Sequence, residues 1–118
     1  MLMIRREQLE LFRANALKDF EDRMIEHIAN FFPKEFAKLG ELNLREMIQY
    51  GSKRASSYGI VSERDVCKYL DLMVVFGRAF DADPTLPWVA RILRDQSVKV
   101  PATRIGRLYE LALKSRNK

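Results

Sequence analysis

Few side chains in this 118-residue chain could bind a metal or act as a nucleophile, because His27 is its one histidine and Cys67 its one cysteine. Structural zinc sites usually combine several cysteine and histidine ligands. Cys67 also lies in the most apolar stretch of the sequence, where burial raises the pKa of a thiol and makes it a poor nucleophile. We therefore expect Cys67 to be a small buried side chain, and we expect no metal, no cofactor and no disulfide.

Three aspartates are further candidates for chemistry. Asp71 stands between two leucines and, as a general acid or base, would need a positioned partner that the sequence does not identify. We expect it to pair with an arginine such as Arg78 or to lie on a narrow polar strip. Asp81 and Asp83 resemble the start of a calcium-binding loop, but the glycine and the final glutamate of that loop are missing, so helix caps are the expected role.

The residues of common enzyme sites are also missing from the sequence. It contains neither a glycine-rich phosphate loop nor a serine nucleophile elbow. A single histidine and the lack of paired acids in a recognisable frame leave general acid–base catalysis without its usual residues. We predict that the protein is not an enzyme and has no small-molecule substrate.

The elements that must position these side chains all show the helical period. From Arg5 to Phe32, apolar residues recur at steps of three and four, which predicts one long amphipathic helix. Pro33 is expected to break that helix, and Gly40 to end the short segment after it. Asn43 is the expected N-cap of the next helix.

A nearly all-apolar helix over residues 63–80 is the predicted centre of the fold. Ser62 and Asp65 have the spacing of a capping box at its start. Since so little of this helix is polar, the other helices must cover it. The residues expected at its centre are Val66, Leu70, Met73, Val74 and Gly77. Small residues in the preceding helix, at positions 51, 52, 55 and 56, predict a close approach of a neighbouring helix.

Two more helices, at 87–94 and from 101 onward, complete the prediction. Proline can occupy the first position of each. The predicted fold class is all-α: residues 1–118 form a single domain, a compact irregular bundle of five or six helices around the hydrophobic helix at about 63–80.

The net charge of +5 is concentrated at one end of the chain. Residues 99–118 hold six basic side chains and one acid, Glu110, whereas the rest has equal numbers of each. Such an end could meet nucleic acid, a membrane or an acidic protein surface, or could be a solvated helix face. The longest apolar run, 72–76, is far too short for a membrane span, and no signal-peptide pattern opens the chain. With its lone cysteine, the protein is expected in the cytoplasm, without membrane contact.

A helix-turn-helix is one alternative interpretation, because a small residue and then Gly59 precede the helix that starts near 63. That helix would have to lie in the major groove of DNA. Its sides are apolar, and only Arg64 and Lys68 near its start could reach bases or phosphates. Nucleic acid is therefore not the expected partner.

Two features do not have the pattern of a core and are predicted to bind a partner. One is the turn at 81–88, which two prolines make rigid; Trp88 within it is either a core plug or an exposed anchor of an interface. The other is the basic end, which suits an acidic protein surface. The candidate partner-binding residues are Asp83, Leu86, Trp88, Arg104, Arg107 and Lys114.

Most of the chain carries a resemblance to a known group. Residues 58–66 and 76–88, together with the short runs 32–33, 39–41 and 107–109, resemble small helical bacterial proteins encoded beside type VI secretion spike, adaptor and effector genes. The resemblance implies a co-chaperone that assists an adaptor when an effector is loaded onto the spike. An immunity protein against a secreted toxin is the alternative at such loci. Immunity proteins against basic toxins are typically acidic, and this chain is basic, so the co-chaperone role is the leading hypothesis.

Overall fold

The computed structural model describes residues 6–116, apart from the side chains of Leu9, Phe12, Ser115 and Arg116. Residues 1–5 and 117–118, which include part of the predicted first helix and the last basic residue, lie outside the described part. The described residues contain six α-helices and one short 3₁₀ helix, and no strand. Their bounds are α1 Arg6–Phe31, α2 Pro33–Leu39, α3 Glu41–Ser57, α4 Glu63–Phe76, η1 Phe80–Ala82, α5 Pro87–Leu93 and α6 Pro101–Arg116. The all-α bundle is confirmed.

Proline and glycine set most of the helix boundaries, as expected. Pro33 occupies the first turn of α2, and Gly40, with φ of 81°, ends that helix and precedes α3. The predicted N-cap Asn43 is wrong. Because α3 already begins at Glu41, Asn43 lies inside its first turn, where its side-chain amide donates a 2.8 Å hydrogen bond back to the carbonyl of Leu39.

α4 starts at the predicted cap but stops earlier than predicted. The backbone N–H of Asp65 donates to Ser62 Oγ at 3.3 Å, which caps the helix. The helix ends at Phe76 because Gly77 takes φ of 109°, a left-handed value that favours glycine. Gly77 is exposed rather than buried at the centre. Phe80 nevertheless remains in the core, since η1 turns it back inward.

α4 is the central helix, as predicted, and it packs against α1, α3, α6 and η1. Val66, Leu70, Met73 and Val74 are all buried. The small residue Gly51 lets α3 approach closely, because a Cβ at this position would lie 2.4 Å from Leu70 Cδ2. With its sides covered in this way, α4 does not have the exposed faces that a DNA recognition helix needs.

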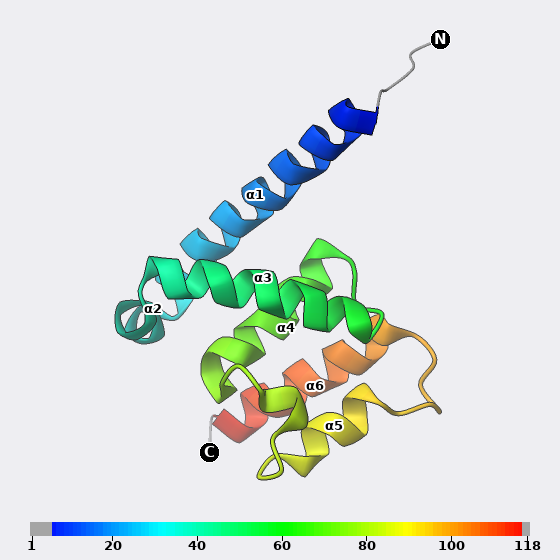
Figure 1. Cartoon of the computed structure of the whole chain (residues 1–118). Helices are drawn as coiled ribbons and strands as arrows, with labels where there is room; N and C mark the ends of the chain where they lie inside the picture. The colour runs from blue at the N-terminus through cyan, green and yellow to red at the C-terminus, as the bar shows by residue number, and fades with distance from the viewer. Residues whose placement is uncertain (1–5, 117–118) are drawn as a thin grey trace.

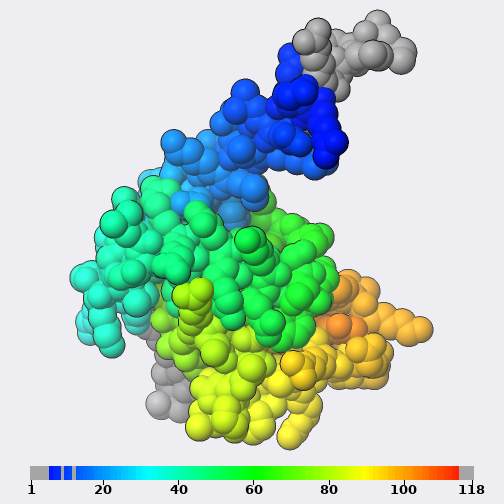
Figure 2. Space-filling view, viewed as in Figure 1, coloured from blue at the N-terminus to red at the C-terminus, as the bar shows by residue number. Residues whose placement is uncertain are grey.

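α1 is longer than the bundle that it packs against. Its second half contacts α2, α3 and α4, whereas its first half projects from the rest of the molecule, as Figures 1 and 2 show. The described structure measures 55 × 38 × 20 Å along its principal axes. None of the described helices combines the length and the apolar character that crossing a membrane requires.

Candidate functional site

The projecting half of α1 is the most exposed helical surface of the molecule. Every side chain that the structure describes between Arg6 and Asp19 is exposed. Among the side chains that the structure describes in this segment, two are large and apolar: Leu11 is 64% exposed and Leu17 is 66% exposed. Burying a leucine from such a position is worth about 1.5–3 kcal/mol. We call this segment, residues 6–19, the free half of α1.

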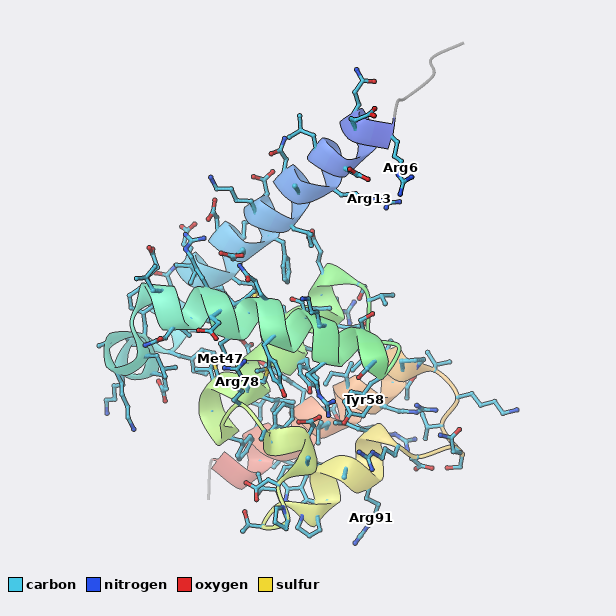
Figure 3. The ribbon with its side chains drawn as sticks, viewed as in Figure 1. Arg6, Arg13, Met47, Tyr58, Arg78 and Arg91 are labelled. Atoms are coloured by element: carbon cyan, nitrogen blue, oxygen red, sulfur yellow. The ribbon has the colours of Figure 1, made fainter. Side chains whose placement is uncertain are left out.

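A groove lies between α1 and the facing ends of α3 and α4. It has a volume of about 420 Å³, and its lining is mostly apolar. Leu17 and Phe20 form one wall, while Ile60 and the 75% exposed Val61 lie on the other side. The remaining lining residues are Arg13, Ala16, Ser52, Ser56, Glu63 and Val66. Figure 3 shows Arg13 on the projecting part of α1.

Ion pairs fix the angle at which α1 leaves the bundle. Arg23 donates two hydrogen bonds to Glu63 at the start of α4, at 2.9 and 3.0 Å. Arg45 on α3 reaches Glu21 at 2.9 Å and Asp22 at 2.8 Å. These contacts lie directly after the free half and join α1 to α3 and α4 beside the groove.

The three predicted partner-binding residues of the 81–88 turn are only partly available. Asp83 accepts hydrogen bonds from the backbone N–H and the hydroxyl of Thr85, at 2.9 and 2.7 Å. Leu86 and Trp88 are half-buried against the core, and the indole of Trp88 meets the ring of Phe76 edge-on at 6.0 Å. The turn is therefore well ordered, and Trp88 has the contacts of a core plug as well as some exposed surface.

The other three predicted residues come together on α6. Arg104, Arg107 and Lys114 line one hollow of about 330 Å³, which Asp83, Leu86 and Trp88 do not line. Arg104 is partly occupied there, since its Nε donates a 2.5 Å hydrogen bond to the carbonyl of Val98 in the preceding loop. Arg107 and Lys114 are exposed.

Asp71 is buried and has partners that the sequence did not suggest. His27 Nε2 lies 2.9 Å from Asp71 Oδ1, and the Tyr109 hydroxyl donates to Asp71 Oδ2 at 3.1 Å. The expected partner Arg78 is elsewhere, with its guanidinium 4.1 Å from the ring centre of Tyr50. Burial raises the pKa of Asp71 above its ordinary value, and the contacts with His27 and Tyr109 only partly oppose this effect.

Asp81 is also buried, although it was expected to cap a helix. Arg54 donates to its Oδ2 from both Nε, at 3.1 Å, and a terminal guanidinium nitrogen, while the Tyr58 hydroxyl donates to the same oxygen at 2.7 Å. Burial alone would raise the pKa of Asp81, but the hydrogen bonds from Arg54 and Tyr58 outweigh it and hold that pKa below its ordinary value. This cluster joins α3 to η1.

No protein-family model, curated protein or solved structure matches the chain. The arguments that follow therefore rest on the chain's own residues and geometry, together with the resemblance stated from its sequence.

Proposed function

We propose that the protein is a non-catalytic binding module, and that the free half of α1 and the adjoining groove bind a helix of a partner protein. An amphipathic helix lying in an apolar groove is a common mode of recognition. The groove supplies apolar walls from α1 on one side and from the α3–α4 connection on the other.

The observation that carries the proposal is the lack of support for the free half of α1. Isolated helices shorter than about 12–15 residues are marginal in water, because the nucleation cost is repaid only over length. The side chains that the structure describes between residues 6 and 19 are all exposed, two leucines among them, so they gain little packing from the bundle. A partner that covered this surface would supply the missing packing.

Charge indicates which kind of helix suits the groove. Glu63 at its rim is already paired with Arg23, whereas Arg13 adds a positive charge to the lining. A partner helix with an apolar face flanked by acidic residues would match both features. The hollow that Arg104, Arg107 and Lys114 line also contains Asp95 and Glu110, so the exposed Arg107 and Lys114 are the side chains that offer a second contact for an acidic surface of the same partner.

The resemblance to proteins of type VI secretion loci supports a specific partner. We propose that this protein is a cytoplasmic co-chaperone, and that its partner is the adaptor protein that carries an effector to the secretion spike. In this role it would stabilise the adaptor or the adaptor–effector complex by helix packing, without a cofactor.

The test is co-expression and co-purification with a type VI secretion adaptor, the kind of protein that the resemblance implies as the partner. Leu11→Glu combined with Leu17→Glu should reduce complex formation at least tenfold, because two charges would enter the apolar contact. The matched control is Leu42→Glu, since Leu42 is 83% exposed on α3 and lies outside the groove. Circular dichroism should show unchanged helix content in the bundle for both variants.

Two other experimental results would change the proposed interface or the proposed role. If Arg107→Glu and Lys114→Glu abolish the complex while the leucine variants bind normally, the interface lies on α6 and the groove proposal is wrong. If the chain binds no adaptor but rescues cells from the neighbouring toxin, the immunity role replaces the co-chaperone role.

A further inference from the structure

Three side chains with metal-binding atoms meet between α1 and α4. Nε2 of His27, Sγ of Cys67 and a carboxylate oxygen of Asp71 all lie within 4.8 Å of one another. Cys67 and Asp71 are four residues apart on α4, so they share one face of that helix. His27 faces them from the packed half of α1, beyond the groove.

We propose that His27, Cys67 and Asp71 form a zinc site that links α1 to α4. The donor set is an imidazole nitrogen, a thiolate and a carboxylate, and all three are common ligands of zinc. A neutral imidazole, a thiolate and a carboxylate together carry two negative charges, so the complex with Zn²⁺ is neutral. Neutrality matters at this position because Asp71 is only 4% exposed, and a buried uncompensated charge is costly.

The surroundings of the cluster suit a metal site. Tyr109 on α6 donates a hydrogen bond to Asp71 Oδ2, while His27 Nε2 lies 2.9 Å from Oδ1 and 3.2 Å from Oδ2. A contact such as that of Tyr109 orients a ligating carboxylate. The ring of His27 is held by Phe31 and Phe32, with centroid separations of 4.9 and 6.3 Å. The His27 side chain is 28% exposed, which gives an ion a path to the site and leaves room for a water as the fourth ligand.

Zinc binding requires the Cys67 thiol to lose its proton. Burial, and then the nearby carboxylate of Asp71, raise the pKa of the Cys67 thiol to about 11, so the thiol is protonated at neutral pH. On binding, the S–H bond breaks, the proton passes to solvent and the sulfur forms the bond to zinc. His27 Nε2 must likewise lose the proton that it shares with Asp71, either to solvent or by a change to the tautomer protonated at Nδ1, and it then binds the ion as the neutral imidazole. Below the pKa of the thiol, zinc affinity should therefore rise about tenfold for each unit by which the pH rises.

The test uses the full chain, freed of metal with a chelator and titrated with Co²⁺ as a spectroscopic probe of the zinc site. We expect saturation at one equivalent, with thiolate-to-cobalt charge-transfer absorption in the near ultraviolet and intense visible bands of a tetrahedral ion. Zn²⁺ should displace the cobalt and raise the melting temperature. A titration without saturation, or without a thiolate band, overturns the proposal.

Variants separate this site from binding at the surface. Cys67→Ala should abolish the charge-transfer band, and His27→Gln should weaken cobalt binding more than tenfold while keeping a hydrogen-bond donor to Asp71. Tyr109→Phe should weaken it about tenfold by removing the contact that orients the carboxylate. The control is Glu26→Gln, which removes an exposed acid next to His27 and should change nothing. If Cys67→Ala binds cobalt as tightly as the original chain, the site does not exist.

A second test of the zinc site measures the alkylation rate of Cys67 and uses only the original chain. Zn²⁺ at saturating concentration should slow alkylation of Cys67 by a thiol reagent at least tenfold in the original chain, because the metal-bound sulfur is not free to attack. Equal alkylation rates with and without Zn²⁺ overturn the proposal, even if a variant fails to fold.

Discussion

The molecule has two buried aspartates whose surroundings look alike but whose behaviour should differ. Asp71 is 4% exposed and Asp81 is 1% exposed. Each accepts a hydrogen bond from one tyrosine hydroxyl, at 3.1 Å from Tyr109 and at 2.7 Å from Tyr58. The two clusters differ in the basic side chain that contacts the carboxylate, which is His27 for Asp71 and Arg54 for Asp81.

That difference sets the direction in which the pKa of each carboxyl group moves. A guanidinium is always protonated and can donate two hydrogen bonds, so the contacts with Arg54 overcome the cost of burial and lower the pKa of Asp81. An imidazole can lose its proton, and the contact with His27 does not overcome the burial of Asp71, whose pKa is raised. Asp81 forms a structural ion pair with Arg54, whereas Asp71 belongs to the cluster that we propose as a zinc site.

The largest effect should follow the loss of Arg54. Arg54→Met keeps the packing of the side-chain stem but leaves the Asp81 carboxylate buried without its cation. Breaking such a pair costs about 3–5 kcal/mol, and we expect about 3 kcal/mol because the Arg54 side chain is itself 37% exposed. Chemical denaturation at neutral pH measures this cost. Arg91→Met, on an exposed side chain of α5 that points away from the bundle (Figure 3), is the control and should cost under about 0.5 kcal/mol.

The pH dependence of stability should separate the two aspartates by sign. The lowered pKa of Asp81 stabilises the fold fully above the unfolded value of 3.8, and this contribution is lost as the pH falls through the folded value. The cost of Asp81→Asn should therefore grow as the pH rises from about 2 to 5.

Asp71 should show the opposite trend. Its raised pKa makes the folded state bind a proton that the unfolded state has already lost above 3.8. Stability falls with rising pH in that window, so Asp71→Asn should become less costly, relative to the original chain, as the pH rises through it. Denaturation midpoints of the two variants across this range measure both trends. If the stability costs of the two variants change with pH in the same direction, the two carboxyl groups titrate alike and the comparison is wrong.

The loss of His27 should cost less than the loss of Arg54. His27→Gln can still donate one hydrogen bond to Asp71, and the raised pKa of that carboxyl lets it take up a proton more readily than Asp81 can. We expect about 1 kcal/mol in metal-free protein at neutral pH, the value of one ordinary hydrogen bond. A loss as large as that of Arg54→Met would mean that the Asp71 cluster is as firmly ionised as the Asp81 cluster.

Local signals in the sequence account for most of the fold. Pro33, Gly40, the Ser62 cap and Pro101 act within a few residues of themselves, so their effects could be predicted. The end of α4 was missed at Gly77, because the apolar pattern continues to Phe80 and hides the stop signal. The sequence pattern also did not predict that the free half of α1 projects from the bundle. The apolar stripe continues along a helix of about 39 Å, and only the tertiary structure shows that the bundle covers part of it.

The buried polar clusters could not be predicted because they join distant parts of the chain. His27 and Asp71 are 44 residues apart, and Arg54 and Asp81 are 27 apart. The one usable signal was the spacing of Cys67 and Asp71, which places two metal-binding side chains on one face of a helix. His27 also directly precedes Ile28 in the apolar stripe of α1, which placed it near the buried face.

The last comparison concerns two tyrosines next to Asp81, and its second variant, Tyr69→Phe, should cost least. The rings of Tyr58 and Tyr69 are 6.3 Å apart. The Tyr58 hydroxyl donates to Asp81, whereas the Tyr69 hydroxyl makes no hydrogen bond of ordinary geometry with the described residues, although the Arg54 guanidinium lies near it. Tyr69 is fully buried, with its ring 5.0 Å from that of Phe80. Tyr58→Phe should cost about 1.5 kcal/mol, because it removes a hydrogen bond to a charged group.

Tyr69→Phe should be neutral, or should stabilise the protein by up to about 1 kcal/mol, because it removes a buried hydroxyl that costs free energy without a partner and keeps the packing of the ring. The two variants differ from the original chain by one oxygen each, so the difference in their unfolding free energies isolates the hydrogen bond to Asp81. If both variants lose the same stability, Tyr69 has a partner in solution and the Asp81 cluster extends further into the core than Arg54 and Tyr58.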